Sequence, residues 1–244
     1  MTTALLLAVV VLGAALQRVS GMGFALVVGP LLVLLVGPVD GVLLVNLCGL
    51  LFSLLMLATT RGAVDWRRLA LLAPSALVGI VPGALLLAAV SAPVLEIVVG
   101  VLVMAGMSAA LLARHAPALD GRFAPVVAGA VSGAMSVTAG TSGPALAVYA
   151  VASRWDPRSF AATAQPYFVM VAAGSVTVKL LLTDARLPAL GAWGYGGIAA
   201  GCVVGLFVGR ALAGRLSPGR TRAVLVVVAF AGGLATAVRG VASL

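Results

Sequence analysis

Long apolar stretches constrain the fold of this chain more than any other feature of its sequence. A helix needs about 20 apolar residues to cross the hydrocarbon core of a bilayer. Five runs reach that length, and a sixth is interrupted only by Gln165, Pro166 and Lys179; the six cover approximately 41–60, 69–90, 94–113, 160–182, 189–209 and 223–241. Only 9% of the residues are charged, where a soluble domain carries about 25%. The sequence therefore predicts an all-α integral membrane protein and excludes a soluble globular domain.

Two further apolar regions are each broken near the middle by a glycine-rich polar stretch. The first covers 4–36 and is broken at 17–23, and the second covers 125–152 and is broken at 138–144. Each half has roughly 8 to 14 residues, or about 12 to 21 Å of helix, which is too short for a core of about 30 Å. Non-helical backbone at membrane depth must be enclosed by protein or face a water-filled cavity. We therefore expect half-helices whose breaks share one vestibule, with two kinked full spans as the alternative.

Basic residues fall almost entirely on one side of the predicted topology. Eleven arginines gather there: Arg61, Arg67, Arg68, Arg114, Arg122, Arg154, Arg158, Arg210, Arg215, Arg220 and Arg222. The opposite side receives only Arg186 and Arg239. By the positive-inside rule the arginine-rich side is cytoplasmic, so both termini are expected to be extracytoplasmic. The formal charge of +9 thus indicates membrane orientation and not a nucleic-acid partner.

The broken regions also mark an internal repeat with an offset of 119 residues. The segment 21–25 aligns with 140–144, and Pro38 aligns with Pro157. We expect one transmembrane transporter domain over 1–244, in which repeat 1 covers about 1–119 and repeat 2 about 120–244. Each repeat contains a broken or re-entrant helical hairpin followed by three transmembrane helices. The number of crossings in a repeat is odd, so the second copy is inverted, and inverted repeats with discontinuous helices are typical of secondary transporters.

Glycines recur at four-residue intervals in the third element of each repeat. They are Gly79 and Gly83 in the first copy, and Gly201, Gly205 and Gly209 in the second. Small residues on one helical face let two backbones approach closely. We interpret this spacing as helix packing without a role in transport.

The two breaks combine residues suited to an anion site. A helix that starts after a break exposes free N–H groups and the positive end of its dipole, and glycine lets a bound group come close to that backbone. Two such ends that converge would bind an anion, although a glycine-rich break can also be a simple kink. The candidate substrate-binding residues of the breaks are Gly21, Met22, Gly23, Gly140, Thr141, Ser142 and Gly143.

Four longer polar side chains are further candidates for substrate binding. Arg18 lies in the first break with no carboxylate nearby in sequence, so it would either meet a substrate anion or snorkel to water. Lys179 lies about one turn from a helix end, where snorkelling is the stronger interpretation. Asn46 and Gln165 occupy equivalent positions in the two repeats. Their amides could bind substrate oxygens or hold helices together.

These motifs resemble a known family. Gly-x-Gly at 21–23 with Pro30 downstream, and Gly-Thr-Ser-Gly-Pro at 140–144 with Tyr149 downstream, are similar to the paired motifs of the TauE/SafE family of sulfite exporters and related permeases. The likeness covers nearly the whole chain. It implies secondary transport of small sulfur-containing oxyanions or organosulfonates such as sulfite, sulfoacetate or taurine-related compounds. The first motif departs from the family's usual glycine run at Met22, which leaves the substrate open.

The leading functional hypothesis is a permease that moves a small anion by alternating access. A carrier of the same architecture for another small anion or a neutral solute is the alternative. A membrane-embedded enzyme is disfavoured, because Ser142 has no histidine or carboxylate near it in sequence. We expect no cofactor and no metal; the expected partners are the anion and membrane lipid. The expected location is the cytoplasmic (inner) membrane of a prokaryote.

Overall fold

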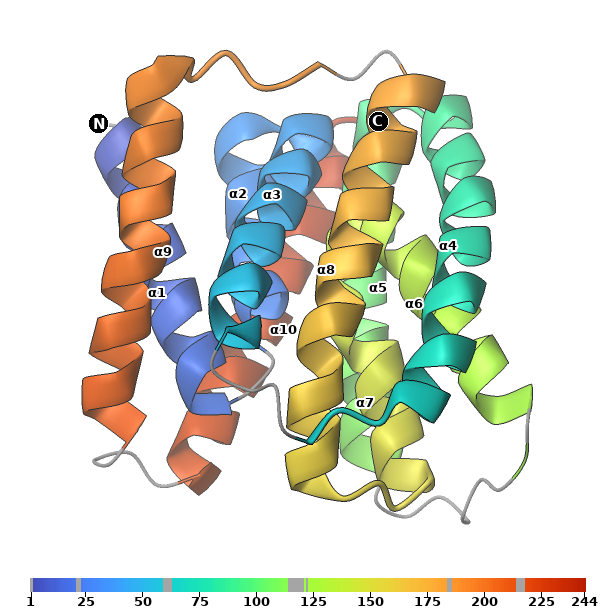
Figure 1. Ribbon diagram of the computed structural model, residues 1–244. Coiled ribbons are helices and arrows are strands. Elements are labelled where there is room, and N and C mark those ends of the chain that lie inside the picture. The colour runs from blue at the N-terminus through green and yellow to red at the C-terminus, as the bar shows by residue number, and fades with distance from the viewer. Residues whose placement is uncertain are drawn as a thin grey trace.

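Helices account for all the regular structure in the part of the chain that the computed structural model describes. Those residues are 2–20, 23–58, 63–113, 121, 123–183, 186–213 and 218–244. The helices are α1 (Thr2–Ser20), α2 (Phe24–Val36), α3 (Pro38–Leu57), α4 (Trp66–Ala89), α5 (Ala92–Leu112), α6 (Phe123–Ala139), α7 (Gly143–Ala152), α8 (Pro157–Leu182), α9 (Gly191–Ala213) and α10 (Pro218–Ala242). They run roughly along one direction, and both termini lie at the upper face (Figure 1). The all-α prediction is confirmed.

The six apolar runs correspond to the six helices that are long and apolar enough to cross a membrane, namely α3, α4, α5, α8, α9 and α10. Local sequence explains where several of them begin. Pro38 and Pro157 open α3 and α8, where the missing N–H of proline is not needed. The Asp65 carboxylate caps α4 by accepting a hydrogen bond from the N–H of Arg68 at 3.0 Å, and Asp156 caps α8 in the same way.

Both broken regions are helical hairpins. α1 and α2 meet at a break before Phe24, and α6 and α7 meet at residues 140–142. The first arm of each hairpin is longer than predicted, with 19 residues in α1 and 17 in α6. The sequence prediction placed 17–20 and Thr138 in the breaks, whereas the structure places them in helix. Gln17 and Arg18 are good helix formers, and the Thr138 hydroxyl bonds to the Ala134 carbonyl oxygen within its own helix, so polar character alone did not end either helix.

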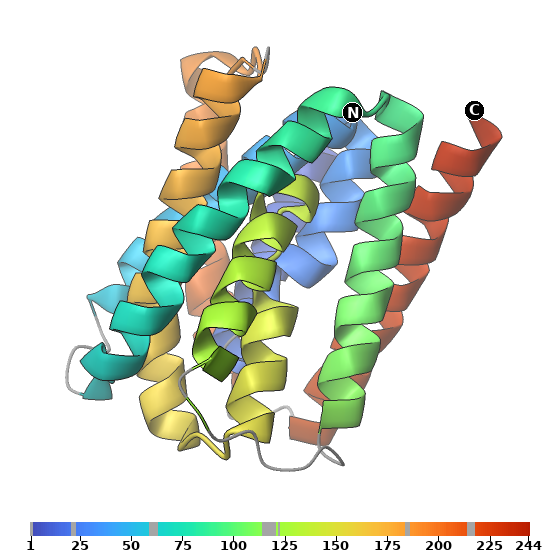
Figure 2. The same ribbon diagram turned by 90° about the vertical axis from the view of Figure 1, so that its right-hand side faces the viewer.

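The contacts between helices have the pairing that an inverted repeat requires. If the hairpin α1–α2 corresponds to α6–α7, then α3, α4 and α5 correspond to α8, α9 and α10. The packing of α4 on α6 has its counterpart in α9 on α1, and α5 packs on α10 while α3 packs on α8. Figure 2 shows α4 beside α6 and α5 beside α10. The architecture is consistent with two inverted repeats.

Glycines bring α4 against α6 and α9 against α1, which confirms the predicted close packing. A Cβ on Gly83 would lie 2.6 Å from Cγ1 of Val137 and 3.0 Å from Cα of Ala134 in α6. A Cβ on Gly209 would lie 2.6 Å from the carbonyl oxygen of Ala15 in α1. Neither position has room for a side chain unless the helices separate.

Arg239 of α10 holds the outer end of α2 at the upper face. Its guanidinium donates hydrogen bonds to the carbonyl oxygens of Leu34 and Val33 at 2.6 and 3.0 Å. Its Nε also donates to a carboxylate oxygen of Glu96 in α5 at 2.9 Å. The last carbonyl groups of a helix lack partners within the helix. Arg239 therefore satisfies the end of α2 and joins it to α5 and α10.

Arg68 of α4 plays a similar part for α7 at the lower face. Its guanidinium donates to the hydroxyl of Ser153, the residue after α7, at 3.2 Å. It also lies 4.6 Å from the ring centroid of Trp155 and forms an ion pair with Asp65. The outer ends of the two short helices are thus each tied to a neighbouring helix by an arginine, at opposite faces.

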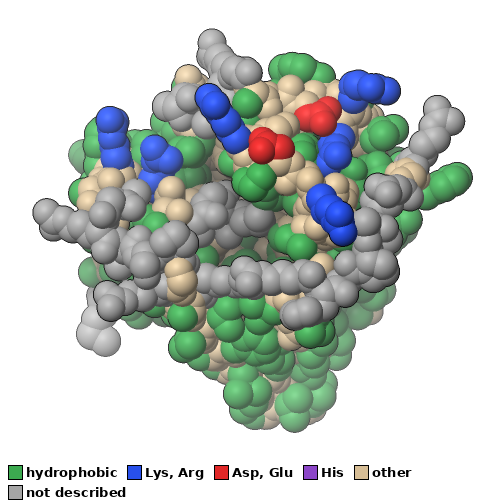
Figure 3. Space-filling model, turned by 90° about the horizontal axis from the view of Figure 1, so that it is seen from below, with side chains coloured by type: hydrophobic (Ala, Val, Ile, Leu, Met, Phe, Trp, Pro, Cys, Tyr) green, Lys and Arg blue, Asp and Glu red, His purple; other side chains and the backbone are tan. Residues whose placement is uncertain are grey.

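The lower face carries most of the described charged side chains (Figure 3). The helix ends that meet there bear Arg67, Arg68, Arg154, Arg158 and Arg210. Arg220 and Arg222 belong to the first turns of α10, and Arg61, Arg114, Arg122 and Arg215 lie outside the described residues. The upper ends of the helices contribute Arg186 and Arg239. The one-sided distribution expected from the sequence is therefore present among the described residues.

We predict that Gly79→Ala destabilises the protein, whereas the control Gly196→Ala does not. A Cβ on Gly79 would overlap the backbone of Ala130 in α6, but one on Gly196 would have nothing within 4 Å. Overpacking costs about 1–3 kcal/mol, while alanine is favoured over glycine in an open helical position by up to about 1 kcal/mol. Thermal unfolding in detergent measures both. Equal melting temperatures for the two variants would contradict the close packing of α4 and α6.

Candidate functional site

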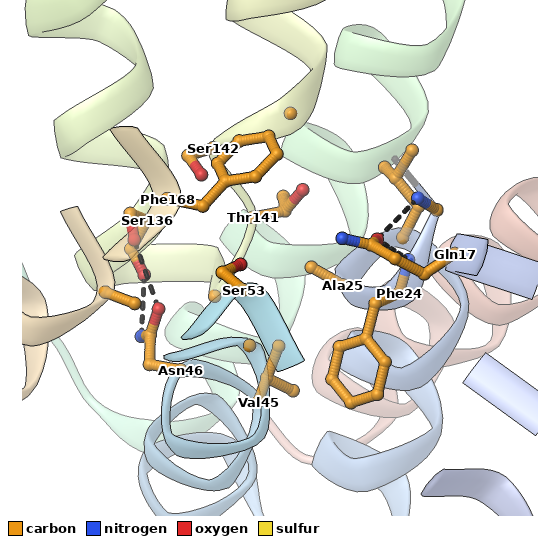
Figure 4. Close-up of a pocket in the computed structure, with 16 residues that line it drawn as sticks. Gln17, Phe24, Ala25, Val45, Asn46, Ser53, Ser136, Thr141, Ser142 and Phe168 are labelled. Atoms are coloured by element: carbon orange, nitrogen blue, oxygen red, sulfur yellow. Dashed lines mark hydrogen bonds between the residues drawn. The ribbon is translucent and has the colours of Figure 1, made fainter. Parts of the chain in front are cut away.

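A cavity of about 50 Å³ lies between the two helix breaks (Figure 4). Its described lining consists of Gln17 of α1, Gly23, Phe24, Ala25 and Leu26 at the start of α2, Val45, Asn46, Gly49 and Ser53 of α3, Ser136 of α6, Gly140, Thr141, Ser142 and Gly143 of the second break, and Phe168 and Ala172 of α8. The two breaks share one cavity, as the sequence predicted.

The second break presents an uncapped helix start to this cavity. α6 ends at Ala139, and the next residue, Gly140, has a φ of +69°, a left-handed conformation that side chains disfavour. The Ser132 hydroxyl donates to the carbonyl oxygen of Ser142 at 2.8 Å and so fixes the loop against α6. Ser142 makes no side-chain cap on α7. The N–H of Gly143, the first residue of α7, is therefore available to a ligand in the cavity, while the second residue, Pro144, has no N–H.

The first break differs, because a side chain already occupies the start of α2. Oε1 of Gln17 accepts hydrogen bonds from the N–H groups of Gly23 and Phe24 at 2.9 and 2.7 Å. Gln17 is buried, and it reaches across the break from the last turns of α1. The sequence prediction did not single out Gln17. The sequence feature that could have identified Gln17 as a cap is a long amide side chain a few residues before a glycine in an apolar helix.

This cap also decides which way the Gln17 amide faces. Both bonds to the α2 backbone need an acceptor, so the oxygen must face α2 and the nitrogen must face away from it. Figure 4 shows the Nε2 atom of Gln17 directed towards the side of the cavity that holds Thr141. Gln17 thus blocks one helix start and offers a hydrogen-bond donor to the cavity.

Asn46 connects the cavity wall to α6 and α8. Its Nδ2 donates to the carbonyl oxygen of Ser136 at 3.0 Å, and the Ser136 hydroxyl donates to its Oδ1 at 3.1 Å. The Ser175 hydroxyl of α8 donates to the Ser136 hydroxyl at 2.9 Å. The structure therefore supports a role for Asn46 in joining helices. The same side chain also lines the cavity.

The structure brings together six of the predicted site residues and places three others away from them. Those that line the cavity are Gly23, Asn46, Gly140, Thr141, Ser142 and Gly143. Gly21 and Met22 lie outside the described residues. Arg18, Gln165 and Lys179 are not part of the lining.

The three residues outside the lining have other surroundings. Arg18 belongs to the last turn of α1, so its predicted place in the break is wrong; its Cβ lies 2.7 Å from where a Cβ of Gly209 in α9 would be. Gln165 donates through Nε2 to the carbonyl oxygen of Ala161 in its own helix at 3.3 Å. Lys179 is fully buried, so the snorkelling interpretation is wrong.

The cavity offers hydrogen-bond donors without charged side chains. No Asp, Glu, Lys or Arg occurs in its described lining. The hydroxyl groups of Ser53 and Thr141 are buried and have no partner among the described residues. Over the same residues, no cluster of three or more His, Cys, Asp or Glu side chains could hold a metal ion. The site is thus suited to a small solute that accepts hydrogen bonds.

Comparison with known proteins gives one match. A family model described as "Sulfite exporter TauE/SafE" matches residues 5–236, which span both hairpins and reach into α10. No curated protein and no solved structure matches the chain. Because the family match covers nearly all of the 244 residues and agrees with a multi-pass helical fold, the chain belongs to the TauE/SafE family of sulfite exporters.

Proposed function

We propose that this protein is a secondary transporter that carries a small sulfur-containing oxyanion, such as sulfite or an organosulfonate, by alternating access. The observation that carries this proposal is the uncapped start of α7 within a cavity whose described lining holds donors and no carboxylate. Membership of a transporter family supports transport in place of catalysis.

In this proposal the anion binds at the start of α7. Free N–H groups and the helix dipole favour negative charge there. The Thr141 and Ser53 hydroxyls and the Nε2 of Gln17 would complete the set of donors. All of them are neutral, so they can replace water around an anion without binding it too tightly to leave. The small cavity suits a solute of a few heavy atoms, since sites for drug-sized ligands are typically about 300–1,000 Å³.

Alternating access is supported by the arrangement of the two hairpins. The breaks reach the same cavity from opposite faces, and the helix contacts have the pairing of an inverted repeat. In transporters built from inverted repeats, each repeat can take the conformation of the other and so expose the site to either side.

We predict that Gln17→Glu abolishes sulfite transport but preserves stability. A carboxylate can accept the same hydrogen bonds from Gly23 and Phe24, and the start of α2 favours its charged form. The carboxylate also places a negative charge in the cavity. Two like charges about 5 Å apart repel by about 3 kcal/mol at an effective dielectric of about 20. That repulsion lowers the affinity for the anion roughly 100-fold. Uptake of radiolabelled sulfite into proteoliposomes measures transport, and thermal unfolding measures stability.

Gln17→Met is the matched control, with the opposite pattern. It leaves the N–H groups of Gly23 and Phe24 without an acceptor, and each unpaired group costs about 1–3 kcal/mol. The melting temperature should therefore fall. Sulfite transport should be slower, because the Nε2 donor of Gln17 is lost, but it should not be abolished, because no negative charge enters the cavity. Wild-type rates in the Gln17→Glu variant would show that the anion does not bind in this cavity.

The orientation in the membrane is a separate proposal, with the arginine-rich lower face in the cytoplasm and both termini outside it. Arg67→Cys places an exposed thiol at the start of α4, on the lower face. Ala92→Cys places one at the start of α5, on the upper face. Cys48 and Cys202 are buried, so they should not react with a membrane-impermeant maleimide. In intact cells only the cysteine at position 92 should be labelled. Labelling of position 67 instead would reverse the orientation.

A further inference from the structure

Lys179 is buried, and the proposed anion site gives no reason for a buried basic side chain at this position. It lies in α8, one turn before the helix ends at Leu182, and its side chain has no exposed surface. Its Nζ has no hydrogen-bond partner among the described residues. A buried ionisable side chain in a membrane-spanning helix is costly and is usually functional.

The charged groups around Lys179 are few. α8 packs against α3, α4 and α6. α3 contributes Asp40, whose negative charge favours the charged form of Lys179, while its other titratable group, Cys48, interacts with Cys202. The described charges of α4 are Arg67 and Arg68 at its far end, and described α6 has no titratable side chain. Asp184 lies outside the described residues.

An open cavity lies at the upper face, beside the end of the helix that carries Lys179. A cavity of about 510 Å³ is lined by Leu182 and Thr183 at the end of α8 and by two charged residues of opposite sign, Asp40 and Arg186. The N–H and hydroxyl of Thr183 both donate to the carbonyl oxygen of Lys179, at 3.1 and 2.6 Å. Lys179 therefore lies one helical turn below a wide polar opening that contains a carboxylate.

Lys179 shares one face of α8 with residues that line or contact the anion cavity. Phe168, Ala172, Ser175 and Lys179 are spaced by four, three and four residues, so they share one face of α8, and the first two line the cavity. Ser175 lies about 6 Å along the helix from Lys179. It bonds to Ser136, which itself lines the cavity. A change of charge at Lys179 can thus act on the anion cavity through a short, buried segment.

We propose that Lys179 is a proton-binding site that couples the anion to a proton, so that the two cross the membrane in the same direction. The inference rests on the proposed anion transport. When the cavity is empty, Asp40 is the one described negative charge that acts on Lys179, and burial of the ammonium group favours the neutral amine. When an anion enters, its charge stabilises the ammonium form. The amine then takes a proton from a hydronium ion in the opening beside Asp40; one N–H bond forms as one O–H bond breaks, and a water molecule is left. When the anion leaves on the other side of the membrane, the N–H bond breaks and the proton passes to water on that side.

The experiment compares wild-type protein with Lys179→Met in proteoliposomes that contain a trapped pH-sensitive dye. Methionine has a similar length and no charge, so it removes the proton site with little change in packing. Sulfite flux and proton flux are recorded together. Sulfite itself binds and releases protons, but this contribution is the same for both proteins, so a difference between them reports protons carried by Lys179. We expect the wild type to move additional protons with sulfite and to accumulate sulfite in response to a pH gradient. Lys179→Met should move sulfite down its own gradient and lose the pH-driven accumulation completely.

The possible failures are distinguishable. No sulfite flux in the wild type under any gradient would overturn the proposed function. Equal proton-to-sulfite ratios in the two proteins, or protons that move opposite to sulfite, would overturn the role of Lys179 and leave anion transport standing. If Lys179→Met is unstable or inactive, proton uptake is measured when sulfite is added to purified wild type in weak buffer, with a protein-free titration subtracted. Absence of protein-linked uptake there would also overturn the proposal.

Discussion

The start of a helix inside a membrane exposes N–H groups that have no water to bond, and this constraint shapes the centre of the protein. The two breaks meet it differently. At α2 the need is met within the protein, because the Gln17 oxygen accepts both N–H groups. At α7 no described side chain forms a cap, and the Thr141 hydroxyl, which has no partner among the described residues, lies next to that start. The start of α2 is thus satisfied within the protein, whereas the donors that remain open lie at the second break.

The parts of this arrangement that depend on local sequence could be predicted. Hydropathy located the six long helices, and the glycines at 23 and 140–143 located the two breaks, because apolar length and glycine content act directly on the backbone. The role of Gln17 could not be predicted in this way. Its function depends on a side chain that folds back over a break onto another helix, and nothing in the neighbouring sequence encodes that contact.

Arg18 and Lys179 show the same limit for charged residues. Sequence places each near a helix end, where a long basic side chain can commonly reach water. Which direction the side chain takes depends on the neighbours that pack around that end. α8 is covered by α3, α4 and α6, so Lys179 is enclosed, while Arg18 lies against the glycine surface of α9 and away from the cavity. For Asn46 the sequence left two roles open, and the structure supports both contact with helices and access to the cavity.

The arginine contacts hold the outer ends of α2 and α7 in place, while the inner end of each short helix lies at the cavity. Because α7 has 10 residues and is about 15 Å long, a tilt of about 10° around its held end would carry its inner end through roughly 2 to 3 Å. That displacement is enough to exchange one hydrogen-bond partner for another. The held ends lie at opposite faces, so tilts of α2 and α7 would move their inner ends from opposite sides of the same cavity.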